Sequence, residues 1–271
     1  MHLSHLSIFC CPHCQHALTL SHGDGHTGMV VCTQGHPFAI TRGVLDLLGP
    51  AQPQSAAAWV NEFAITAWLY ERIWRPYALT LMSGTAFPYT RELTWLCGTV
   101  PSTCRTIVDV ACSNGLYARA LAQSHPQAHI IGIDRAMPML VEAVVRADAA
   151  RLPISYVRAD ARALPFGTAG IDAVVVGGSW NEMEELPRVF AEMARITIPR
   201  GRLVAMALTQ STRRLGAAIQ RLLSGGGTQF FDPTDLAAQL LEAGWHLDAA
   251  TVTGVVWQGV ASRTEHPDGQ S

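Results

Sequence analysis

Lysine is missing from this sequence of 271 residues, so arginine alone supplies its 19 strongly basic side chains. These arginines are balanced by 21 acidic residues, which leaves a formal net charge of −2 at pH 7. Residues 1–50 contain one arginine and two acids, and the rest of the chain contains 18 arginines and 19 acids. The sequence therefore lacks the concentrated positive charge of a nucleic-acid-binding body, which makes nucleic acid an unfavoured partner.

Long hydrophobic runs are also lacking. No stretch approaches the roughly 18–20 apolar residues that span a bilayer, and the N-terminal MHLSHLSIFCC has neither the basic segment nor the apolar run of a secretion signal. We expect a cytoplasmic protein without a membrane partner. In a reducing compartment, seven cysteines indicate metal ligands or buried thiols before disulfides.

The residues that are present divide the chain into three segments. Residues 1–48 hold seven of the eleven histidines and four of the seven cysteines, which predicts a small metal-binding module. Residues 49–103 begin with a Pro/Ala/Gln linker and continue as an aromatic-rich helical stretch. From residue 104 to 271 strand-like and helix-like runs alternate, which predicts an α/β fold with a doubly wound parallel sheet covered by helices on both faces.

The metal module has the most specific spacing. Cys11 and Cys14 form a C-x2-C pair, and Cys32 and His36 form a C-x3-H pair, which together supply three thiolates and one imidazole. Four protein ligands suit a closed tetrahedral zinc site, which is structural rather than catalytic. Incidental cysteines without a metal are the alternative, and other residues are near enough in sequence to replace a ligand: Cys10, His13 and His16.

A second pattern begins at TIVDVACSNGLYARAL, residues 106–121. Asp109 through Gly115 occupy the tight turn after the first strand of the sheet, where backbone N–H groups and a helix N-terminus face a ligand. Asp134 ends the second strand about 20 residues later, where a carboxylate accepts the two hydroxyls of a ribose. Asp160 ends the third strand, where it could accept from an adenine amino group. Each Asp alone could be a helix cap or loop residue, but their order favours an adenosine-containing ligand.

Together with IDAVVVGGS, these motifs resemble the class I S-adenosylmethionine (SAM) dependent methyltransferases of the ubiquinone/menaquinone type. The front end, CPHC…CTQGHPFAITRGVLDLL, is similar to the zinc ribbon of the 23S rRNA guanine-N1 methyltransferases. The linking stretch WLYERIWRP…FPYTRELTWL looks more like uncharacterised methyltransferases of plant plastids and bacteria. The resemblance implies a Rossmann-like sheet of seven strands in the order 3-2-1-4-5-7-6. It also implies that SAM is held by Asp109, Gly115, Asp134, Met139, Asp160, Ala161 and Gly177.

The turn departs from this family at two glycine positions, which are Ala111 and Ser113 here. Both are expected to contact the cofactor. We expect an ordinary negative φ at Ala111. A positive φ at Ser113 would cost roughly 1–2 kcal/mol, which weakens a cofactor site without abolishing it. The turn is therefore predicted to bind SAM.

Acceptor-facing residues are expected in two places. Aromatic residues are concentrated between residues 59 and 77, and they either dock helices on the sheet or line a cleft for a flat acceptor; Tyr70 and Trp74 are the substrate-contacting candidates. After the fourth strand, Trp180 and Asn181 are expected to face the acceptor, and Glu182 to accept a proton. An acidic run such as the one around Glu182 also suits helix capping.

Three functions remain open at this stage. The favoured one is a SAM-dependent methyltransferase that acts on a small aromatic or polyketide-like metabolite of natural-product biosynthesis. An rRNA guanine methyltransferase is the second, supported by the predicted zinc ribbon but opposed by its single arginine, because phosphate binding needs several cations. A SAM-binding protein with non-methyl or no catalytic activity is the third, suggested by the altered turn. The sequence defines neither the acceptor atom nor the oligomeric state.

Overall fold

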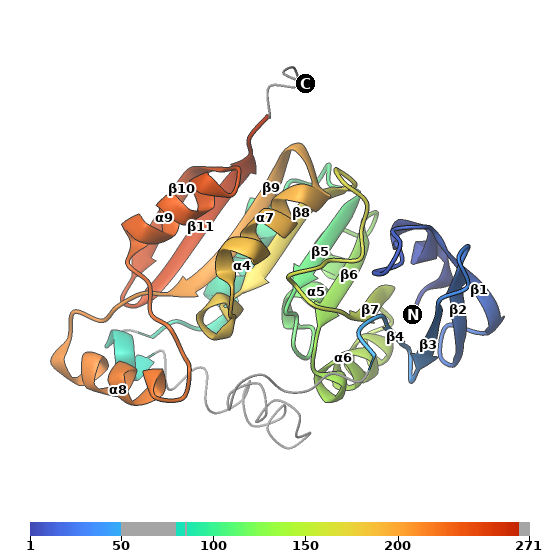
Figure 1. The fold of residues 1–271 in the computed structure, drawn as a ribbon. Helices are drawn as coiled ribbons and strands as arrows, with labels where there is room; N and C mark the ends of the chain where they lie inside the picture. Colours follow the sequence, from blue (N-terminus) through green and yellow to red (C-terminus); the bar gives the residue numbers. More distant parts are fainter. Residues whose placement is uncertain (50–79, 85, 266–271) are drawn as a thin grey trace.

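The computed structural model describes residues 1–49, 80–84 and 86–265. Its strands form one sheet of eleven in the order β1-β2-β3-β4-β7-β6-β5-β8-β9-β11-β10 (Figure 1). The strands are β1 (Leu18–Gly23), β2 (Gly28–Cys32), β3 (Pro37–Thr41), β4 (Val44–Asp46), β5 (Thr106–Val110), β6 (His129–Asp134), β7 (Ile154–Arg158), β8 (Ile171–Gly177), β9 (Thr197–Leu208), β10 (Trp245–Thr253) and β11 (Val256–Arg263).

The seven strands from β5 onward form the α/β part of the sheet. Strands β5 to β9 pair in parallel, and β11 pairs antiparallel with both β9 and β10. Numbered along the chain from β5, the spatial order of these seven reads 3-2-1-4-5-7-6. The polypeptide crosses from the middle of the sheet outward in two directions, so the ends of β5 and β8 meet where the direction changes.

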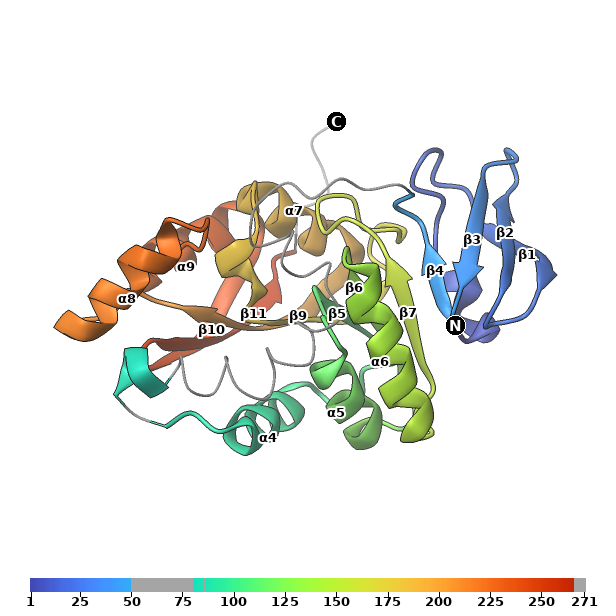
Figure 2. The same cartoon turned by 90° about the horizontal axis from the view of Figure 1, so that it is seen from below.

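We expected a sheet of seven strands. The sheet is larger because β1 to β4 of the N-terminal module extend it. Strand β4 pairs in parallel with β7, with Val44 opposite Tyr156 and Asp46 opposite Arg158. Without β4, β7 would be an edge strand with unpaired backbone groups. The module therefore covers one edge of the α/β sheet and continues its hydrogen bonding (Figure 2).

Helices cover both faces of the α/β sheet (Figure 2). One face carries α4, α5 and α6, and the other carries α7 and α9. The helices are α4 (Tyr89–Thr99), α5 (Leu116–Ser124), α6 (Met137–Ala149), α7 (Leu186–Ile196), α8 (Arg214–Ser224) and α9 (Pro233–Glu242), with short 3-10 helices η1 (Leu3–Ile8) and η3 (Ser179–Glu182). At the start of α9 the Asp232 carboxylate accepts from Thr234 N at 2.8 Å as an N-cap.

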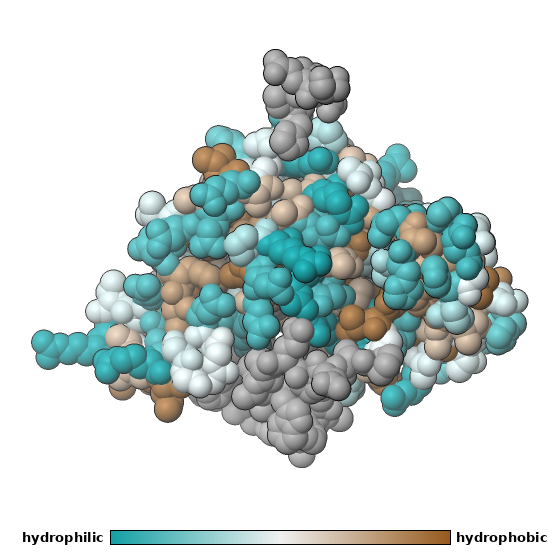
Figure 3. All heavy atoms as spheres, viewed as in Figure 1, coloured by the Kyte–Doolittle hydropathy of each residue, from teal (hydrophilic) through white to brown (hydrophobic). Residues whose placement is uncertain are grey.

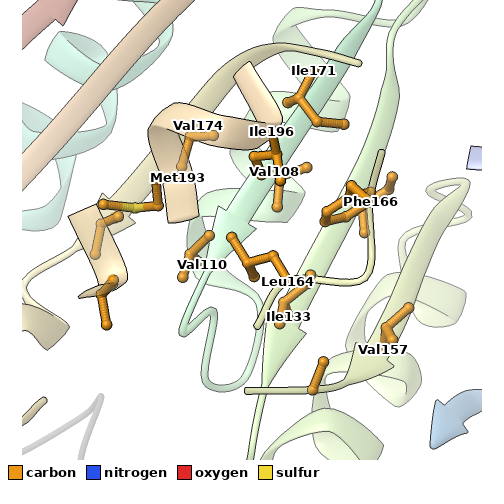
Figure 4. Close-up of a cluster of buried hydrophobic side chains, with 14 of the residues drawn as sticks. Val108, Val110, Ile133, Val157, Leu164, Phe166, Ile171, Val174, Met193 and Ile196 are labelled. Carbon is orange, nitrogen blue, oxygen red and sulfur yellow. The ribbon is translucent and has the colours of Figure 1, made fainter. Parts of the chain in front are cut away.

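The core is built from the apolar runs of the central strands. Val108, Val110 and Ile133 point from β5 and β6 toward Met193 and Ile196 at the end of α7 (Figure 4). Strands that are buried on both faces read as continuous hydrophobic runs, which is why TIVDV and IDAVVV are apolar almost throughout. The N-terminal module is part of the same cluster, to which it contributes the buried residues Leu6, Phe9, Leu18, Val30, Phe38, Ile40, Leu45 and Leu47.

The surface is mixed in character. On the face that carries α7, hydrophilic side chains gather over the centre and hydrophobic ones lie in separate patches (Figure 3). No helix among the described residues is long and apolar enough to cross a membrane.

The expected aromatic cap falls largely within residues 50–79, so Tyr70 and Trp74 lie outside the described residues.

Candidate functional site

Cys11, Cys14, Cys32 and His36 converge in the N-terminal module, as their spacing predicted. One ligand atom from each lies within 4.8 Å of the others. The Cys14 and Cys32 sulfurs are 3.6 Å apart, and the His36 Nδ1 atom lies 3.5 Å from the Cys11 sulfur and 3.3 Å from the Cys32 sulfur. A tetrahedral zinc ion with bonds of about 2.3 Å to sulfur and about 2.0–2.1 Å to nitrogen separates its ligands by about 3.5–3.8 Å. The donor set and its spacing therefore fit zinc.

Tight turns bring the two residues of each ligand pair together. Cys32 N donates to His36 O at 3.2 Å, and Gly35 N donates to Cys32 O at 2.9 Å. Gly35 has a φ of +84°, a conformation that glycine adopts without strain. Cys11 and Cys32 are buried, whereas Cys14 and His36 are partly exposed. The sequence CTQGH thus folds back so that its first and last residues face the same point.

In the turn after β5, every second residue from 111 to 115 has a left-handed backbone conformation. The φ angles are +55° at Ala111, +51° at Ser113 and +75° at Gly115. Our expectation of an ordinary negative φ at Ala111 is therefore wrong, because the tight turn places this residue in the left-handed region as well. Two residues with a Cβ atom occupy left-handed conformations, each of which costs roughly 1–2 kcal/mol. Strain of this kind is concentrated at functional sites.

Asp134 is held against this turn. Its Oδ2 atom accepts from Ser113 N at 2.8 Å, and its Oδ1 atom accepts from Ala136 N at 2.9 Å. The Ser113 hydroxyl donates to the Met139 sulfur at 3.5 Å, which connects the turn to the first part of α6. The structure therefore brings together three residues that were predicted to hold the cofactor, at the adjacent carboxyl ends of β5 and β6.

Gly115 allows the turn to close over Tyr156. A Cβ atom at Gly115 would lie 2.3 Å from the Tyr156 hydroxyl oxygen, and one at Gly132 would lie 2.6 Å from the tyrosine ring. Tyr156 is fully buried beneath the turn, and burial raises the pKa of its hydroxyl. Burial also raises the pKa of the neighbouring Cys112 thiol, so this cysteine stays protonated and supports the turn rather than acting as a nucleophile.

Asp160 lies at the end of the third strand as predicted, but with arginine partners that the sequence reasoning missed. Its carboxylate pairs with Arg162 at 2.8 Å and with Arg135 at 3.2 Å. Burial opposes ionisation of this carboxyl group, but the hydrogen bonds from Arg162 and the charge of Arg135 outweigh it and lower its pKa. The carboxylate is thus ionised and oriented. The sequence segments IDR and VRADAR could have indicated these partners, because each contains an arginine within two residues of an aspartate.

The other predicted cofactor residues surround the same edge. Asp109 is buried, and its Oδ2 atom accepts from Ala118 N at 3.0 Å, which fixes the first turn of α5. Ala161 is half-buried beside Asp160, and Gly177 is half-buried at the end of β8. A Cβ atom at Gly177 would lie 3.1 Å from the Tyr117 ring, so glycine leaves room for this ring. Their direct contacts with a cofactor remain predictions.

Two of the residues expected to face the acceptor are structural instead. Trp180 is fully buried and packs edge-on against Phe190 at 4.8 Å between ring centroids. Asn181 is also buried, where its amide donates to Leu208 O at 2.8 Å and its side-chain oxygen accepts from Leu208 N at 2.8 Å. These placements contradict our expectation for both residues, because their side chains connect η3 to the core and to β9.

Glu182 differs from these two neighbours because it is exposed at the end of η3. The acidic residue that directly precedes α7 is Glu185, which pairs with Arg162 and Arg188. Glu185 therefore occupies the N-cap position of α7, although its side chain pairs with arginines and makes no capping hydrogen bond. A proton-accepting Glu182 remains a prediction.

A buried pair near the turn was not anticipated. The Tyr117 hydroxyl donates to Glu92 Oε1 at 2.5 Å, and both side chains are buried between α5 and α4. RELTWL gave no signal for this pair, because a glutamate in the first turn of a helix is ordinarily an exposed, dipole-matching residue. The pair places a carboxylate beside the ends of β5 and β8.

The sheet, the strained turn and the two oriented aspartates have the arrangement expected of an α/β domain that binds a nucleotide-like ligand at the carboxyl ends of its strands. Residues 107–201, from β5 into β9, match the family described as "Methyltransferase domain". Among curated relatives, the demethylmenaquinone methyltransferase of Thermus thermophilus is 34% identical over 102 residues, which is 38% of this chain and 46% of that protein. The biotin biosynthesis bifunctional protein BioHC of Saccharophagus degradans is 33% identical over 135 residues, which is 50% of this chain and 24% of that protein.

The fold agrees with these matches. A SAM-dependent methyltransferase of Aquifex aeolicus has a TM-score of 0.54 and 16% sequence identity, over 68% of this chain and 93% of that one. The segment from β5 into β9 therefore matches a methyltransferase family in sequence, and the chain shares its fold with this solved methyltransferase. The chain spans less than half the length of the two curated relatives.

Proposed function

We propose that this protein is a SAM-dependent methyltransferase. The observation that carries the proposal is the link between Ser113 N and Asp134 Oδ2 at 2.8 Å, which joins the strained turn to the carboxylate placed for a ribose. Asp160 adds an ionised carboxylate at the neighbouring strand end, where it suits an adenine amino group. Gly115 and Gly177 leave room for the Tyr156 and Tyr117 side chains that pack beneath this edge of the sheet. These residues fit SAM, which supplies an electrophilic methyl group on a sulfonium.

The protein's own contribution to such a reaction is positioning and, for a protonated acceptor, removal of a proton. The exposed Glu182 follows the end of β8 and is the proposed proton acceptor. Trp180 and Asn181 hold the η3 segment in place, so that Glu182 projects from a fixed support. Methyl transfer to an acceptor nucleophile breaks the carbon–sulfur bond and leaves S-adenosylhomocysteine (SAH).

We further propose that the acceptor is a small aromatic or polyketide-like metabolite. The name of the Thermus relative specifies demethylmenaquinone, which is a small molecule rather than a nucleic acid. The near-neutral net charge of −2 and the single arginine in residues 1–50 also offer few contacts for the phosphates of a nucleic acid. Tyr70 and Trp74 remain proposed contacts to it.

The N-terminal module suggests the second candidate function. The four-ligand cluster supports the predicted resemblance to the ribbon of rRNA guanine methyltransferases. We propose that the cluster holds a structural zinc ion, because all four ligand positions come from the chain. An rRNA methyltransferase is nevertheless disfavoured, since a module with one arginine offers few phosphate contacts.

Transfer of a labelled methyl group from SAM tests these alternatives. We expect label in small phenolic or quinone-like acceptors, and no label in rRNA fragments at either low or physiological salt. Labelled rRNA, together with micromolar, salt-sensitive binding in a filter assay, would reverse the order of the two functions. Binding of SAH without transfer to either class of acceptor would favour the SAM-binding protein with other chemistry.

A further inference from the structure

Arg158 connects the N-terminal module to the proposed cofactor site. It is the last residue of β7, and only 9% of its surface is exposed. Its Nη1 atom donates to Asp46 Oδ2 at 3.1 Å and to Gly49 O at 2.7 Å, while its Nε atom donates to Arg135 O at 2.8 Å. One planar guanidinium group therefore contacts two segments that are distant in sequence.

The module side of this connection is fixed in three ways. Asp46 lies opposite Arg158 in the parallel pairing of β4 with β7, and Leu47 N donates to Arg158 O at 3.0 Å. The second carboxylate oxygen of Asp46 accepts from Leu48 N at 3.1 Å and from Gly49 N at 3.0 Å. The two acceptors of the guanidinium group, Asp46 Oδ2 and Gly49 O, are thus held in place by contacts that do not involve the Arg158 side chain.

The cofactor side consists of the short segment between β6 and α6. Arg135, whose carbonyl oxygen is held by Arg158, lies between Asp134 and Ala136. The carboxylate of Asp134 accepts from Ala136 N, and the Arg135 side chain reaches Asp160. Arg158 therefore fixes the peptide that determines the direction of the ribose-side carboxylate and supports the adenine-side carboxylate.

We propose that Arg158 is a positioning residue through which the N-terminal module sets the affinity of the methyltransferase domain for the nucleoside half of its cofactor. The inference rests on the proposed function, because it assumes a nucleoside ligand at Asp134 and Asp160. Affinity depends on preorganisation, since a carboxylate held in its bound direction loses little freedom on binding. Arginine suits this role because its fork contacts several acceptors at once, whereas lysine acts as a point charge.

Calorimetry with two ligands tests the proposal. SAH contains the nucleoside and amino-acid halves, and methylthioadenosine lacks the amino-acid half. We expect Arg158→Gln to weaken both ligands by the same factor, about tenfold or more, and Arg158→Lys to have an intermediate effect. Asp46→Asn should weaken both ligands by a smaller common factor. It provides a second variant if Arg158→Gln fails to fold.

Arg202→Gln is the matched control, because Arg202 forms an ion pair with Asp248 at 2.5 Å between β9 and β10, away from the cofactor site. It should leave both affinities unchanged, and melting curves should show every variant folded at the temperature of titration. Wild-type affinity in folded Arg158→Gln, or a loss confined to SAH, would overturn the inference. A wild-type protein that binds neither ligand would instead overturn the proposed function on which the inference rests.

Discussion

The N-terminal module and the α/β domain are ordered by different means, although they share one sheet. In residues 1–49, four candidate metal ligands lie within 4.8 Å of one another at the turns between short strands. In residues 104–265, the central apolar strands are buried between two layers of helices. The comparison shows that the spacing of four residues can predict which side chains converge in a small module, whereas the larger domain is predicted from its apolar runs.

The two regions are nevertheless not independent in their packing. Phe9 forms a bridge with Phe166, and Cys10 N donates to Pro165 O at 2.9 Å. The apolar residues of the module belong to the same buried cluster as those beneath α7. We infer that docking on the α/β domain stabilises the module in addition to a bound metal, so the comparison becomes testable by removing either contribution.

The largest effect is expected from removal of a ligand. Cys14→Ser should reduce the zinc content of the purified protein from about one ion per chain to none, because a hydroxyl is a poor replacement for a thiolate. The module should then become sensitive to proteolysis. Metal analysis and limited proteolysis measure both effects.

Cys10→Ser is the matched control, because Cys10 is adjacent in sequence but does not belong to the cluster of four ligands. It should retain the metal. A Cys14→Ser protein that keeps its zinc, or a metal-free wild type with a protease-resistant module, would contradict the claim that a metal held by these four residues stabilises the module.

In the α/β domain, the next largest effect is expected at Glu182. Glu182→Gln should lower turnover at least tenfold with SAH affinity unchanged, because it removes a proton acceptor without changing the shape of η3. Glu184→Gln, a change at an exposed neighbour, should have no effect. Equal turnover in wild type and Glu182→Gln would exclude Glu182 as the proton acceptor.

A smaller effect is expected from restoring glycine to the turn. Ser113→Gly should bind SAH as tightly as the wild type or up to about tenfold more tightly, because Ser113 has a φ of +51° and its Cβ atom occupies space near the ligand. Ser113→Ala keeps the Cβ atom and should show no gain. A Ser113→Gly protein with much weaker binding would mean that the serine hydroxyl itself holds the cofactor.

The smallest effect is expected at His5, where the two regions meet. Burial, with further contributions from His129, His2 and the N-terminus, lowers the pKa of His5 to about 4. The unfolded chain therefore binds a proton between about pH 6.5 and pH 4 that the folded protein does not, so stability present above pH 6.5 is lost as pH falls through this window.

His5→Gln should lose less stability than the wild type over the same range, because it has no group to titrate and can still reach the Ser155 hydroxyl, which lies 2.9 Å from His5 Nδ1. Thermal unfolding of the two proteins at matched pH values measures the difference. Parallel pH profiles would show that His5 does not contribute to the pH dependence.

Much of this architecture can be predicted from the sequence because local signals coincide with it. The apolar runs TIVDV, HIIGID and IDAVVVG are strands, and the candidate metal ligands are four residues whose spacing predicted that they converge. The addition of the module to the sheet was not predictable, because VLD is too short to show a pairing partner. The pairing becomes evident only in three dimensions, where β4 lies along β7.

The same limit applies to the site. Asp134 and Asp160 were predictable as residues at strand ends, but Trp180 and Asn181 were assigned to the wrong side of their segment. A 3-10 helix of four residues gives no periodicity from which to infer which side chains are buried. The positive φ of Ala111 was missed because alanine rarely marks a left-handed residue, and only the closed turn requires it.

Titration calorimetry with SAH tests the central claim most directly, namely that the turn and Asp134 form a working cofactor site. The account predicts binding in the micromolar to tens-of-micromolar range for the zinc-loaded protein. It predicts loss of binding in Asp134→Ala, which should still be folded at the temperature of titration although it loses the contacts of this carboxylate with Ser113 N and Ala136 N. Roughly two charge-assisted hydrogen bonds to a ribose would be removed, which weakens binding by about a hundredfold or more. Absence of binding at millimolar SAH in the folded wild type, or unchanged affinity in Asp134→Ala, would contradict the account.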